Sequence, residues 1–598
     1  MGFTPAPAFT TRPTLQGRFG MSASTHWLAT ASAQAVLERG GNAFDASVAA
    51  AFVLHVVEPH LNGPGGDLVA LFATAGDPTP VVLSGQGPAP AAATPEHYRA
   101  EGLELVPGSG SLAAAVPGAV DAWLLLLKDH GTWELSDVLA FAIEYAEEGH
   151  PVLERVCATI RTVAPLFAEH WPTSAEHWMP GGRIPEPGEL ITNPAYARVL
   201  RGLIGAGDAA ATREERIEAA RREWATGTVA QAASAFVRTP HRHSDGGDHA
   251  GVIAENDFAA YRAGYEDAVT LEFRGHTLAK TGAWGQGPAL LATLAILDGF
   301  DDAHLDPSTA LGAHTILEAQ KLAYADRDAY FGDAGVPLDT LLSPGYAAER
   351  RSLIGERASA EFRPGRIPGA EPFLPPLRTE YTPPSGVAAE GVGEPTVSRS
   401  GETRGDTCHI DVIDRWGNIV SATPSGGWLQ SSPTIPELGF CLGTRLQMTW
   451  LEPGSASTLT PGKRPRTTLT PTLVLRDGVP VTALGSPGGD QQDQWQLLYL
   501  LRTLVGGYTP QQAIDAPALH TTSIAESFWP RTWVPAGAVV EARLGDEVIA
   551  ELESRGHRVT RAGDWSLGRL SSVGRDPQTG VLSAAANPRG MQGYAAGR

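Results

Sequence analysis

The residues best suited to chemistry lie in the segment from Gly405 to Asp414, which reads GDTCHIDVID. Thr407 stands at the end of a Pro- and Gly-rich stretch and at the start of an apolar strand pattern. Cleavage between Asp406 and Thr407 would give Thr407 a free α-amine beside its own hydroxyl, so that one residue carries a nucleophile and a base. We therefore predict autocleavage at this bond and nucleophilic amide chemistry at Thr407. The plainer alternative is a threonine that only opens a strand.

The sequence offers little support for thiol or metal chemistry. The three cysteines, Cys157, Cys408 and Cys441, match no disulfide framework and no metal spacing. Because neighbouring side chains of a strand point to opposite faces, we expect Cys408 to pack rather than to act with Thr407. The histidine-rich segment 241–249 matches no zinc pattern, and its glycines favour a flexible surface loop. We therefore predict no metal and no cofactor.

Composition and charge limit the class of protein. The chain has 598 residues, which by length alone allows roughly four domains. Hydrophobic residues make up 42% and charged residues 19%, as in ordinary globular proteins. The net charge of −21 argues against nucleic-acid or anionic-membrane partners. Residues 1–20 lack the apolar run of a secretion signal, and the apolar run 43–57 is too short to span a bilayer. These features favour a cytoplasmic protein.

The elements that must position Thr407 are predicted from the patterns around it. Residues 27–57 resemble two helices interrupted by Gly40, Gly41 and Asn42. The glycine-rich segment 58–67 lacks phosphate-binding motifs and is typical of a tight turn before a strand at 68–72. The remaining predicted stretches are a helix-rich part at 195–330, a Pro- and Gly-rich connector at 363–405, and strands at 410–413, 419–422, 469–475 and 481–485.

Several motifs lie in a characteristic order along nearly the whole chain. They are LERGGNAFDA (37–46), VVEPH (56–60) followed by Gly63, Gly65 and Gly66, AVPG (115–118), EAQKLAYADR (318–327), Thr407 with GN (417–418), KRPRTTLTPT (463–472) and GSPGG (485–489). Together they resemble the γ-glutamyltransferase (γ-glutamyltranspeptidase) family of the N-terminal-nucleophile hydrolase superfamily. The order of several separate motifs makes this resemblance specific.

The resemblance implies an α/β fold of four layers, an αββα sandwich formed as an inactive precursor. The Thr407 hydroxyl would attack the Asp406 carbonyl, and water would release a large subunit 1–406 and a small subunit 407–598. The connector 363–406 would form the end of the large subunit. The two subunits would remain partners, and the number of such pairs stays open, a dimer of heterodimers being one alternative.

The resemblance also assigns catalytic residues. Thr407 would be the nucleophile, and Ser425 aligns with a family threonine that hydrogen-bonds it. The backbone N–H groups of Gly488 and Gly489 would stabilise the oxyanion, each such donor being typically worth about 3 kcal/mol. Thr467 and Thr468 replace two serines that contact the substrate carboxylate, and both keep the hydroxyl donor. The predicted substrate-binding residues are Thr467, Thr468, Gln86 and Arg445.

The family's glutamate pocket is altered. Gln86 stands where the family has an arginine that binds the α-carboxylate, and Met448 falls near an aspartate that binds the α-ammonium. Gly427 replaces an asparagine, and Arg445 replaces the neighbouring glutamine. Losing both charged anchors should cost several kcal/mol for a γ-glutamyl substrate, since each is worth about 1.5–3 kcal/mol. Arg445 is a candidate carboxylate partner from a different side.

Three hypotheses follow. The first is a self-processing threonine hydrolase or acyltransferase that cleaves an amide or related acyl bond of a small, anionic, non-glutamyl substrate, with water or an amine as acceptor. Family analogies for it are oxamate-type amide hydrolysis, acylase activity and carbon–carbon cleavage in antibiotic pathways. The second is a true γ-glutamyl hydrolase or transferase acting on glutathione-like substrates. The third is a non-catalytic relative retained as a scaffold, against which the retention of Thr407, Ser425, Gly488 and Gly489 argues.

Overall fold

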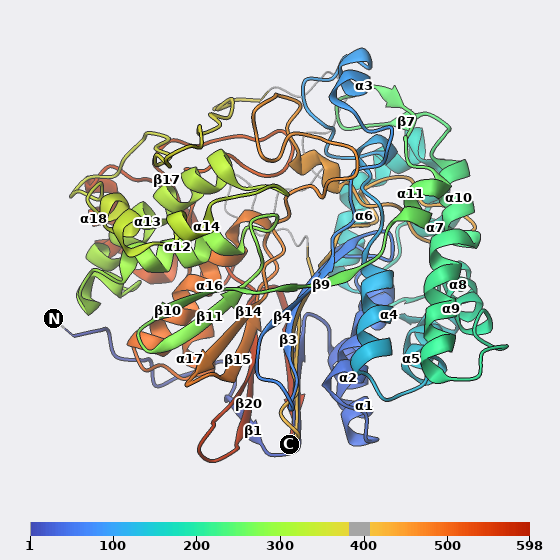
Figure 1. Cartoon of the computed structure of the whole chain (residues 1–598), viewed down its shortest axis with the longest axis horizontal. Coiled ribbons are helices and arrows are strands. Elements are labelled where there is room, and N and C mark those ends of the chain that lie inside the picture. Colours follow the sequence, from blue (N-terminus) through green and yellow to red (C-terminus); the bar gives the residue numbers. More distant parts are fainter. Residues whose placement is uncertain (1, 382–406, 592) are drawn as a thin grey trace.

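The computed structural model describes residues 2–381, 407–591 and 593–598, and its centre is a pair of seven-stranded sheets (Figure 1). Every pairing within the two sheets is antiparallel. The first sheet has the order β1 (Leu15–Gly17), β20 (Leu582–Ala586), β19 (Ser571–Arg575), β15 (Val479–Gly485), β14 (Thr472–Arg476), β11 (His276–Lys280) and β10 (Val269–Phe273). The second has the order β21 (Tyr594–Gly597), β2 (Gly20–Ser24), β12 (Ile410–Asp414), β13 (Ile419–Ser425), β3 (Asp67–Ala73), β4 (Val81–Gly85) and β9 (Gly264–Asp267).

A buried apolar layer joins the facing sides of the two sheets. It takes alternate residues from each strand, because successive side chains of a strand point to opposite faces. Ile413 and Leu71 come from the second sheet, and Leu473 and Val573 come from the first. Both sheets contain strands from before and after Thr407, so the two predicted subunits share one core.

Helices cover the outer face of each sheet (Figure 1). The second sheet is covered by α1 (Trp27–Glu38), α2 (Ala43–Val57), α4 (Ala119–His130), α5 (Leu135–Glu148), α8 (Pro194–Gly205), α9 (Arg213–Thr226) and α10 (Thr228–Phe236). The first is covered by α12 (Gly287–Leu297), α13 (Ala310–Tyr330), α16 (Gln492–Leu500), α17 (Pro510–Asp515) and α18 (Asp546–Ser554). The predicted αββα sandwich is confirmed.

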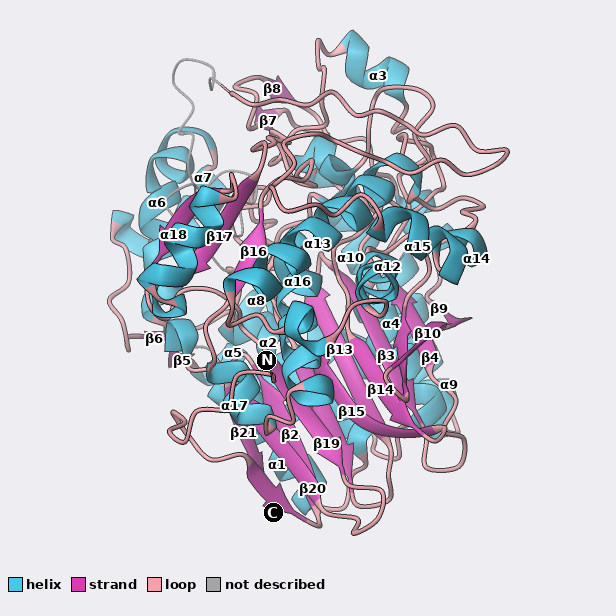
Figure 2. Cartoon of the chain, turned by 90° about the vertical axis from the view of Figure 1, so that its left-hand side faces the viewer, coloured by secondary structure: helices cyan, strands magenta, loops and turns pink. Residues whose placement is uncertain are grey.

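Smaller elements surround the sandwich. A three-stranded sheet of β16 (Leu519–Thr521), β17 (Gly537–Glu541) and β18 (Arg558–Ala562) lies apart from the two large sheets, close to α18 (Figure 2). The other peripheral helices are α3 (Pro95–Ala100), α6 (Glu154–His170), α7 (Pro172–Trp178), α11 (Glu255–Ala260), α14 (Leu338–Leu341) and α15 (Pro344–Arg351). Two small two-stranded sheets pair β5 (His150–Pro151) with β6 (Leu190–Ile191) and β7 (His241–Arg242) with β8 (Asp248–His249), and the second of these is a hairpin.

The start of α2 shows how local sequence forms the expected break between two helices. Asn42 caps the helix by accepting hydrogen bonds from the N–H groups of Phe44 and Asp45, while Asp45 accepts from the Asn42 N–H. This capping box satisfies donors that the first turn leaves unpaired. Every residue of α2 is buried, and its small side chains allow the close packing on the sheet that the sequence predicts.

The part at 195–330 is helix-rich as expected, with α8 to α13, and it also contains β9 and β10, which are edge strands of the two sheets. One sequence expectation needs correction. The histidine-rich segment is a hairpin, β7–β8, rather than a flexible surface loop. Its His243 and Ser244 are buried, and they accept hydrogen bonds from the backbone N–H groups of Leu112 and Gly108, respectively.

The described part of the connector has no regular secondary structure. Residues 363–381 contain no helix or regular strand, and residues 382–406, including Asp406, lie outside the described residues. Among the helices that the structure describes, none is long and apolar enough to cross a membrane.

Candidate active site

Thr407 and Ser425 face each other at the end of a strand ladder. An antiparallel bridge joins them, and the Thr407 Oγ1 lies 3.1 Å from the Ser425 Oγ. The Cys408 N–H donates to the Pro424 carbonyl at 3.0 Å and extends the β12–β13 ladder to this point. Ser425 in turn pairs with Asp67 of β3. Strand register therefore brings Thr407, Ser425 and Asp67 together at the ends of three neighbouring central strands of the second sheet, and all three are buried.

The two glycines after β15 have backbone conformations that other residues rarely adopt. Gly488 has φ of 135° and Gly489 has φ of 50°. A Cβ at Gly488 would lie 2.3 Å from a ring carbon of Trp495. A Cβ at Gly485 would lie 2.2 Å from His409, which is on the same strand face as Thr407. The end of β15, from which the glycine loop starts, therefore lies against the face of the second sheet that bears His409.

Residues of α13 anchor this glycine loop. The Tyr324 hydroxyl donates to the Asp490 carbonyl at 2.8 Å, and the Arg327 Nη1 pairs with the Asp490 carboxylate. Gln286 donates to the Gly489 carbonyl at 3.2 Å and accepts from the Arg327 Nη1 at 3.1 Å. The motif 318–327 thus has a physical role, because Tyr324 and Arg327 hold Asp490 directly and Arg327 also contacts the Gln286 amide that holds the Gly489 carbonyl.

A buried polar chain lies directly behind the Thr407–Ser425 pair. The His409 Nε2 lies 2.9 Å from the Asp411 Oδ1, and its Nδ1 lies 2.9 Å from the Thr423 hydroxyl. The Ser571 hydroxyl donates to the other Asp411 oxygen at 2.8 Å. Because a carboxylate accepts, the Nε2 N–H donates to Asp411. Sequence reasoning missed this chain, although the alternation of Thr407, His409 and Asp411 signals one strand face.

The predicted recognition residue Arg445 is paired with a carboxylate of the protein itself. Its Nε and Nη2 lie 2.6 and 2.8 Å from the two Asp67 oxygens, and both side chains are buried. Burial raises the pKa of Asp67, and the Arg445 charge opposes this shift. The Arg445 Nη1 lies 3.6 Å from the Met448 sulfur. Asp67 and Arg445 therefore neutralise each other beside Ser425.

An apolar cluster occupies the region where the family resemblance places an ammonium-binding carboxylate. Trp428, Met448 and Phe528 pack together, and the Arg445 guanidinium lies 5.7 Å from the Trp428 ring centroid. Met448 ends the short helix η4 (Arg445–Met448). Within the described residues, this wall offers no carboxylate to a substrate ammonium other than Asp67, which is already paired.

The other predicted recognition residues are buried, and two carry unpaired atoms. Gln86 donates to the Gly87 carbonyl at 3.1 Å, but its Oε1 finds no hydrogen-bond partner within the described chain. Thr467 donates its N–H to the Trp284 carbonyl at 2.9 Å. The Thr468 Oγ1 is buried and, among residues 2–381, 407–591 and 593–598, has no partner. Gln86 and Thr468 can therefore still bond a ligand.

Cys408 packs on the opposite strand face, as the sequence predicts. Its thiol donates to Glu58 at 3.1 Å, and burial raises its pKa well above the ordinary value. A raised thiol pKa disfavours the nucleophilic thiolate. Thr407 therefore shares its chemistry with no neighbouring thiol of the described residues.

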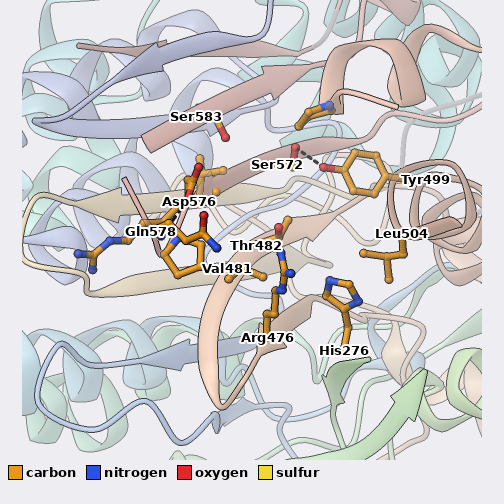
Figure 3. A pocket seen from close by; sticks show the side chains of 15 residues that line it. His276, Arg476, Val481, Thr482, Tyr499, Leu504, Ser572, Asp576, Gln578 and Ser583 are labelled. Atoms are coloured by element: carbon orange, nitrogen blue, oxygen red, sulfur yellow. Dashed lines mark hydrogen bonds between the residues drawn. The ribbon is translucent and has the colours of Figure 1, made fainter. Parts of the chain in front are cut away.

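Another cluster and another cavity lie outside this site. His314, Glu318 and His557 are close enough to share a metal ion, but Lys321 and Arg363 already pair with Glu318 at 2.6 and 3.1 Å. These cations disfavour a metal there. A cavity of about 340 Å³ is lined by residues of β15 and β19 and by Tyr499, whose hydroxyl lies 3.1 Å from Ser572 (Figure 3). None of the predicted site residues lines it.

Comparisons with known proteins identify relatives that match almost the whole chain. The gamma-glutamyltranspeptidase family model matches residues 29–597. The glutathione hydrolase-like YwrD proenzyme of Bacillus subtilis is 31% identical over 95% of this chain and 97% of its own length. The oxamate amidohydrolase proenzyme of Klebsiella pneumoniae is 30% identical, with 97% and 98% covered.

Two solved structures extend this similarity. A threonine-to-alanine variant of LmbA2991 is 54% identical with a TM-score of 0.92, covering 99% of this chain and 100% of that one. A cephalosporin acylase from Bacillus halodurans is 29% identical with a TM-score of 0.81, covering 99% and 98%. The similarity therefore includes both sheets and the ladder that holds Thr407.

Proposed function

Because the chain belongs to the gamma-glutamyltranspeptidase family and is an enzyme of the N-terminal-nucleophile hydrolase class, we propose that it cleaves itself before Thr407 and then acts on a small, anionic, non-glutamyl acyl substrate. The observation that carries the proposal is the Thr407–Ser425 hydroxyl pair at 3.1 Å, which lies at the end of the β12–β13 ladder. The large subunit would be 1–406 and the small subunit 407–598.

The chemistry proceeds by nucleophilic catalysis. In the precursor, the Thr407 oxygen attacks the Asp406 carbonyl and the peptide C–N bond breaks, which frees the Thr407 α-amine and leaves Asp406 as an ester on the Thr407 oxygen. Water then hydrolyses this ester, which releases the Asp406 carboxylate and the Thr407 hydroxyl and separates the two chains. In turnover, the same oxygen attacks the substrate carbonyl while the α-amine accepts the hydroxyl proton and then passes it to the leaving group. Water or an amine then attacks the acyl ester and regenerates the Thr407 hydroxyl.

Two groups support the developing charges in this scheme. The N–H groups of Gly488 and Gly489 are our proposed oxyanion donors, since α13 holds the loop rigid through Asp490. Ser425 holds the Thr407 hydroxyl within hydrogen-bond distance. Both are preorganised by strand and loop geometry, which is the property that transition-state stabilisation requires.

The residues that line the expected ammonium-binding region favour a non-glutamyl acyl group. A γ-glutamyl group carries an α-ammonium, and Met448 and the paired Asp67 provide no free carboxylate for it. Relatives with this machinery are named as a glutathione hydrolase-like protein, an oxamate amidohydrolase and acylases, so different acyl groups occur in the family. The alternative, a true γ-glutamyl hydrolase, is favoured by the first of these names and predicts robust turnover of γ-glutamyl-p-nitroanilide.

Intact-mass analysis of purified protein tests the proposed processing. We expect two chains, the smaller beginning at Thr407. Thr407→Ala should remain a single chain of 62.9 kDa without activity, because the nucleophile is missing. Thr407→Ser keeps a hydroxyl and should still be cleaved. Active enzyme with an unbroken bond before Thr407 would refute the proposal.

A further inference from the structure

Three buried arginines surround two buried carboxylates next to the glycine loop. Arg327, Arg466 and Arg531 lie close to Asp328 and Asp490, and all five side chains are buried. Arg327 pairs with both carboxylates, through Nη1 with Asp490 and through Nε with Asp328 at 2.9 Å. The other two arginines therefore depend on weaker partners. An isolated charge in the protein interior is unfavourable unless it is paired or hydrogen-bonded.

Arg531 finds substitutes for a carboxylate. Its Nη2 donates to the carbonyls of Gln447 and Thr449 at 2.8 and 3.0 Å. Its guanidinium also stacks on Trp450, with 3.9 Å between Cζ and the ring centroid. Such cation–π contacts offset part of the cost of burying the charge.

Arg466 has fewer partners. Its Nη2 donates to the Ser527 hydroxyl at 2.7 Å, and Asp328 is 3.9 Å away, beyond hydrogen-bond distance. Its Nη1 is buried without a hydrogen-bond partner in the part of the chain that the structure describes. Burial, reinforced by Arg327, lowers the pKa of Arg466 to about 10, so the guanidinium is still charged at neutral pH. Arg466 is therefore a cation that can accept an anionic ligand.

The position of Arg466 connects it to the acyl site. It directly precedes Thr467 and Thr468, whose Oγ1 is also buried and unpaired within the described residues. Its partner Ser527 donates to Asp490 at 2.6 Å, and Asp490 follows Gly489. Arg466 is therefore two contacts away from the proposed oxyanion loop.

A series of contacts also connects Ser527, the partner of Arg466, with the proposed nucleophile. Phe528, adjacent to Ser527, packs with Trp428 and Met448. The Arg445 guanidinium lies beside Trp428 and pairs with Asp67, which is opposite Ser425 in the ladder. The contacts therefore form a series that runs from Thr407 to Asp490, with an apolar wall along it and Arg466 bonded to it through Ser527.

We propose that Arg466, together with the Thr468 hydroxyl, binds the carboxylate of an acyl substrate that has no α-ammonium group. The inference rests on the function proposed above and adds the substrate class. A guanidinium is suited to a carboxylate because its N–H groups match the two oxygens. Trp428, Met448 and Phe528 would contact the apolar carbon chain at the point where a glutamyl group carries its ammonium. Glutaryl-type compounds fit both requirements.

Three p-nitroanilides test this class with the processed enzyme. Glutaryl-p-nitroanilide carries the carboxylate alone, γ-glutamyl-p-nitroanilide adds the α-ammonium, and butyryl-p-nitroanilide lacks both groups. We expect the highest kcat/KM for the glutaryl compound. Arg466→Met should lower kcat/KM for it by about 10- to 100-fold, the range of a charged hydrogen bond, and change the butyryl value less than about twofold. Arg466→Lys keeps the charge and should give an intermediate loss.

Arg464 offers a matched control on the same segment. It pairs with Asp333 and Glu266 and stacks on Trp284, so its charge is already compensated. Arg464→Met should leave the ratio of glutaryl to butyryl turnover unchanged. An equal loss for both compounds in Arg466→Met and Arg466→Lys would overturn the proposal, because it would show a structural role only.

Calorimetric binding of free dicarboxylates separates this inference from the proposed function. Succinate, glutarate and adipate are titrated into processed wild-type enzyme and into the Arg466→Met and Arg466→Lys variants. We expect at least one of them to bind wild type and to lose about 10- to 100-fold in affinity in Arg466→Met. If none binds in an Arg466-dependent way, the anchor is wrong even where processing at Thr407 occurs. An uncleaved active chain would instead defeat the proposed function.

Discussion

The two halves of the candidate site are built in different ways. The proposed reaction half consists of Thr407, Ser425 and the paired glycines, whose positions depend on strand register and backbone conformation. The recognition half consists of side chains on loops and on η4, such as Arg445, which depend on partners from distant segments. A side-chain replacement in the recognition half leaves the ladder unchanged. This difference explains how one scaffold can keep a reaction while its substrate changes.

The two halves also differ in how they tolerate charge. The reaction half is supported by the Arg327 pairs with Asp490 and Asp328, which are complete. The recognition half contains a closed pair, Asp67 with Arg445, and one incompletely paired cation, Arg466. Substitutions in the first group should therefore damage stability and rate together, whereas substitutions in the second should change substrate preference.

Removal of the Arg327 side chain should have the largest effect. Arg327→Met leaves Asp490 and Asp328 buried without their main cation, and breaking such a buried pair costs about 3–5 kcal/mol. We expect this loss in the free energy of unfolding, measured with denaturant, and a fall in kcat. Tyr324→Phe removes only the hydrogen bond to the Asp490 carbonyl and should cost about 1 kcal/mol. Equal losses in the two variants would contradict the charge argument.

Disruption of the buried chain behind the nucleophile should be next in size. His409→Ala removes the contacts to Thr423 and Asp411 on the strand face of Thr407. We expect kcat to fall by about 100-fold, the effect of a small misplacement of a reacting group, while KM changes little. Asp411→Asn keeps the side-chain shape and should give a smaller loss of kcat. A change in KM with kcat unchanged would place this chain in recognition instead.

Sequence reasoning predicted the strands around Thr407 better than the contacts of the proposed recognition residues, for a physical reason. Thr407 and the glycine loop depend on short segments whose strand and turn patterns are local, and the strands around 410–413, 419–422 and 481–485 are confirmed. The Asp67–Arg445 pair joins residues 378 positions apart, so no local pattern signals it. The sequence shows that Arg445 is charged, but only the fold shows that this charge is already paired.

The same limit applies to the edge strands and the hairpin. The strands β9 to β11 lie in a part with strong helical patterns, and their partners are β4 and β14. The β7–β8 hairpin has glycines typical of a mobile loop, yet His243 and Ser244 accept backbone hydrogen bonds from segment 108–112. In both cases, long-range contacts decide the structure.

Restoring a carboxylate at the apolar wall should sharpen the comparison with a moderate effect. In the double variant Gln86→Arg with Met448→Asp, the new aspartate lies near the Arg445 Nη1 and the region meant for an ammonium. We expect the ratio of γ-glutamyl to glutaryl turnover to rise by about tenfold or more, as for one charged contact. Processing at Thr407 should be unchanged, which mass analysis checks. An unchanged substrate ratio would contradict the assignment of these two positions to recognition.

A pH dependence confined to the recognition half should have the smallest effect. Hydrogen bonding to Asp245, with Glu101 also in contact, raises the pKa of His249 from 6.5 to about 9. The folded state therefore holds this proton more tightly than the unfolded state does. The contribution of protonated His249 to the free energy of unfolding is complete below pH 6.5 and is lost as the pH rises to about 9. The hairpin that carries His249 binds Gly108, whose carbonyl accepts from Gln447 of η4 at 3.2 Å.

We therefore expect KM for glutaryl-p-nitroanilide to rise between pH 7 and 9.5, because deprotonation of His249 weakens the hairpin that holds Gly108 against Gln447 of η4. His249→Gln cannot carry the charge, so its KM should already be raised at pH 7 and should change little with pH. The ratio of the two KM values isolates His249, because every other titrating group is common to both proteins. Since strand register holds the reaction half independently of the hairpin, kcat should differ little between the two proteins across this range. A difference confined to kcat would show that the hairpin supports catalysis rather than binding.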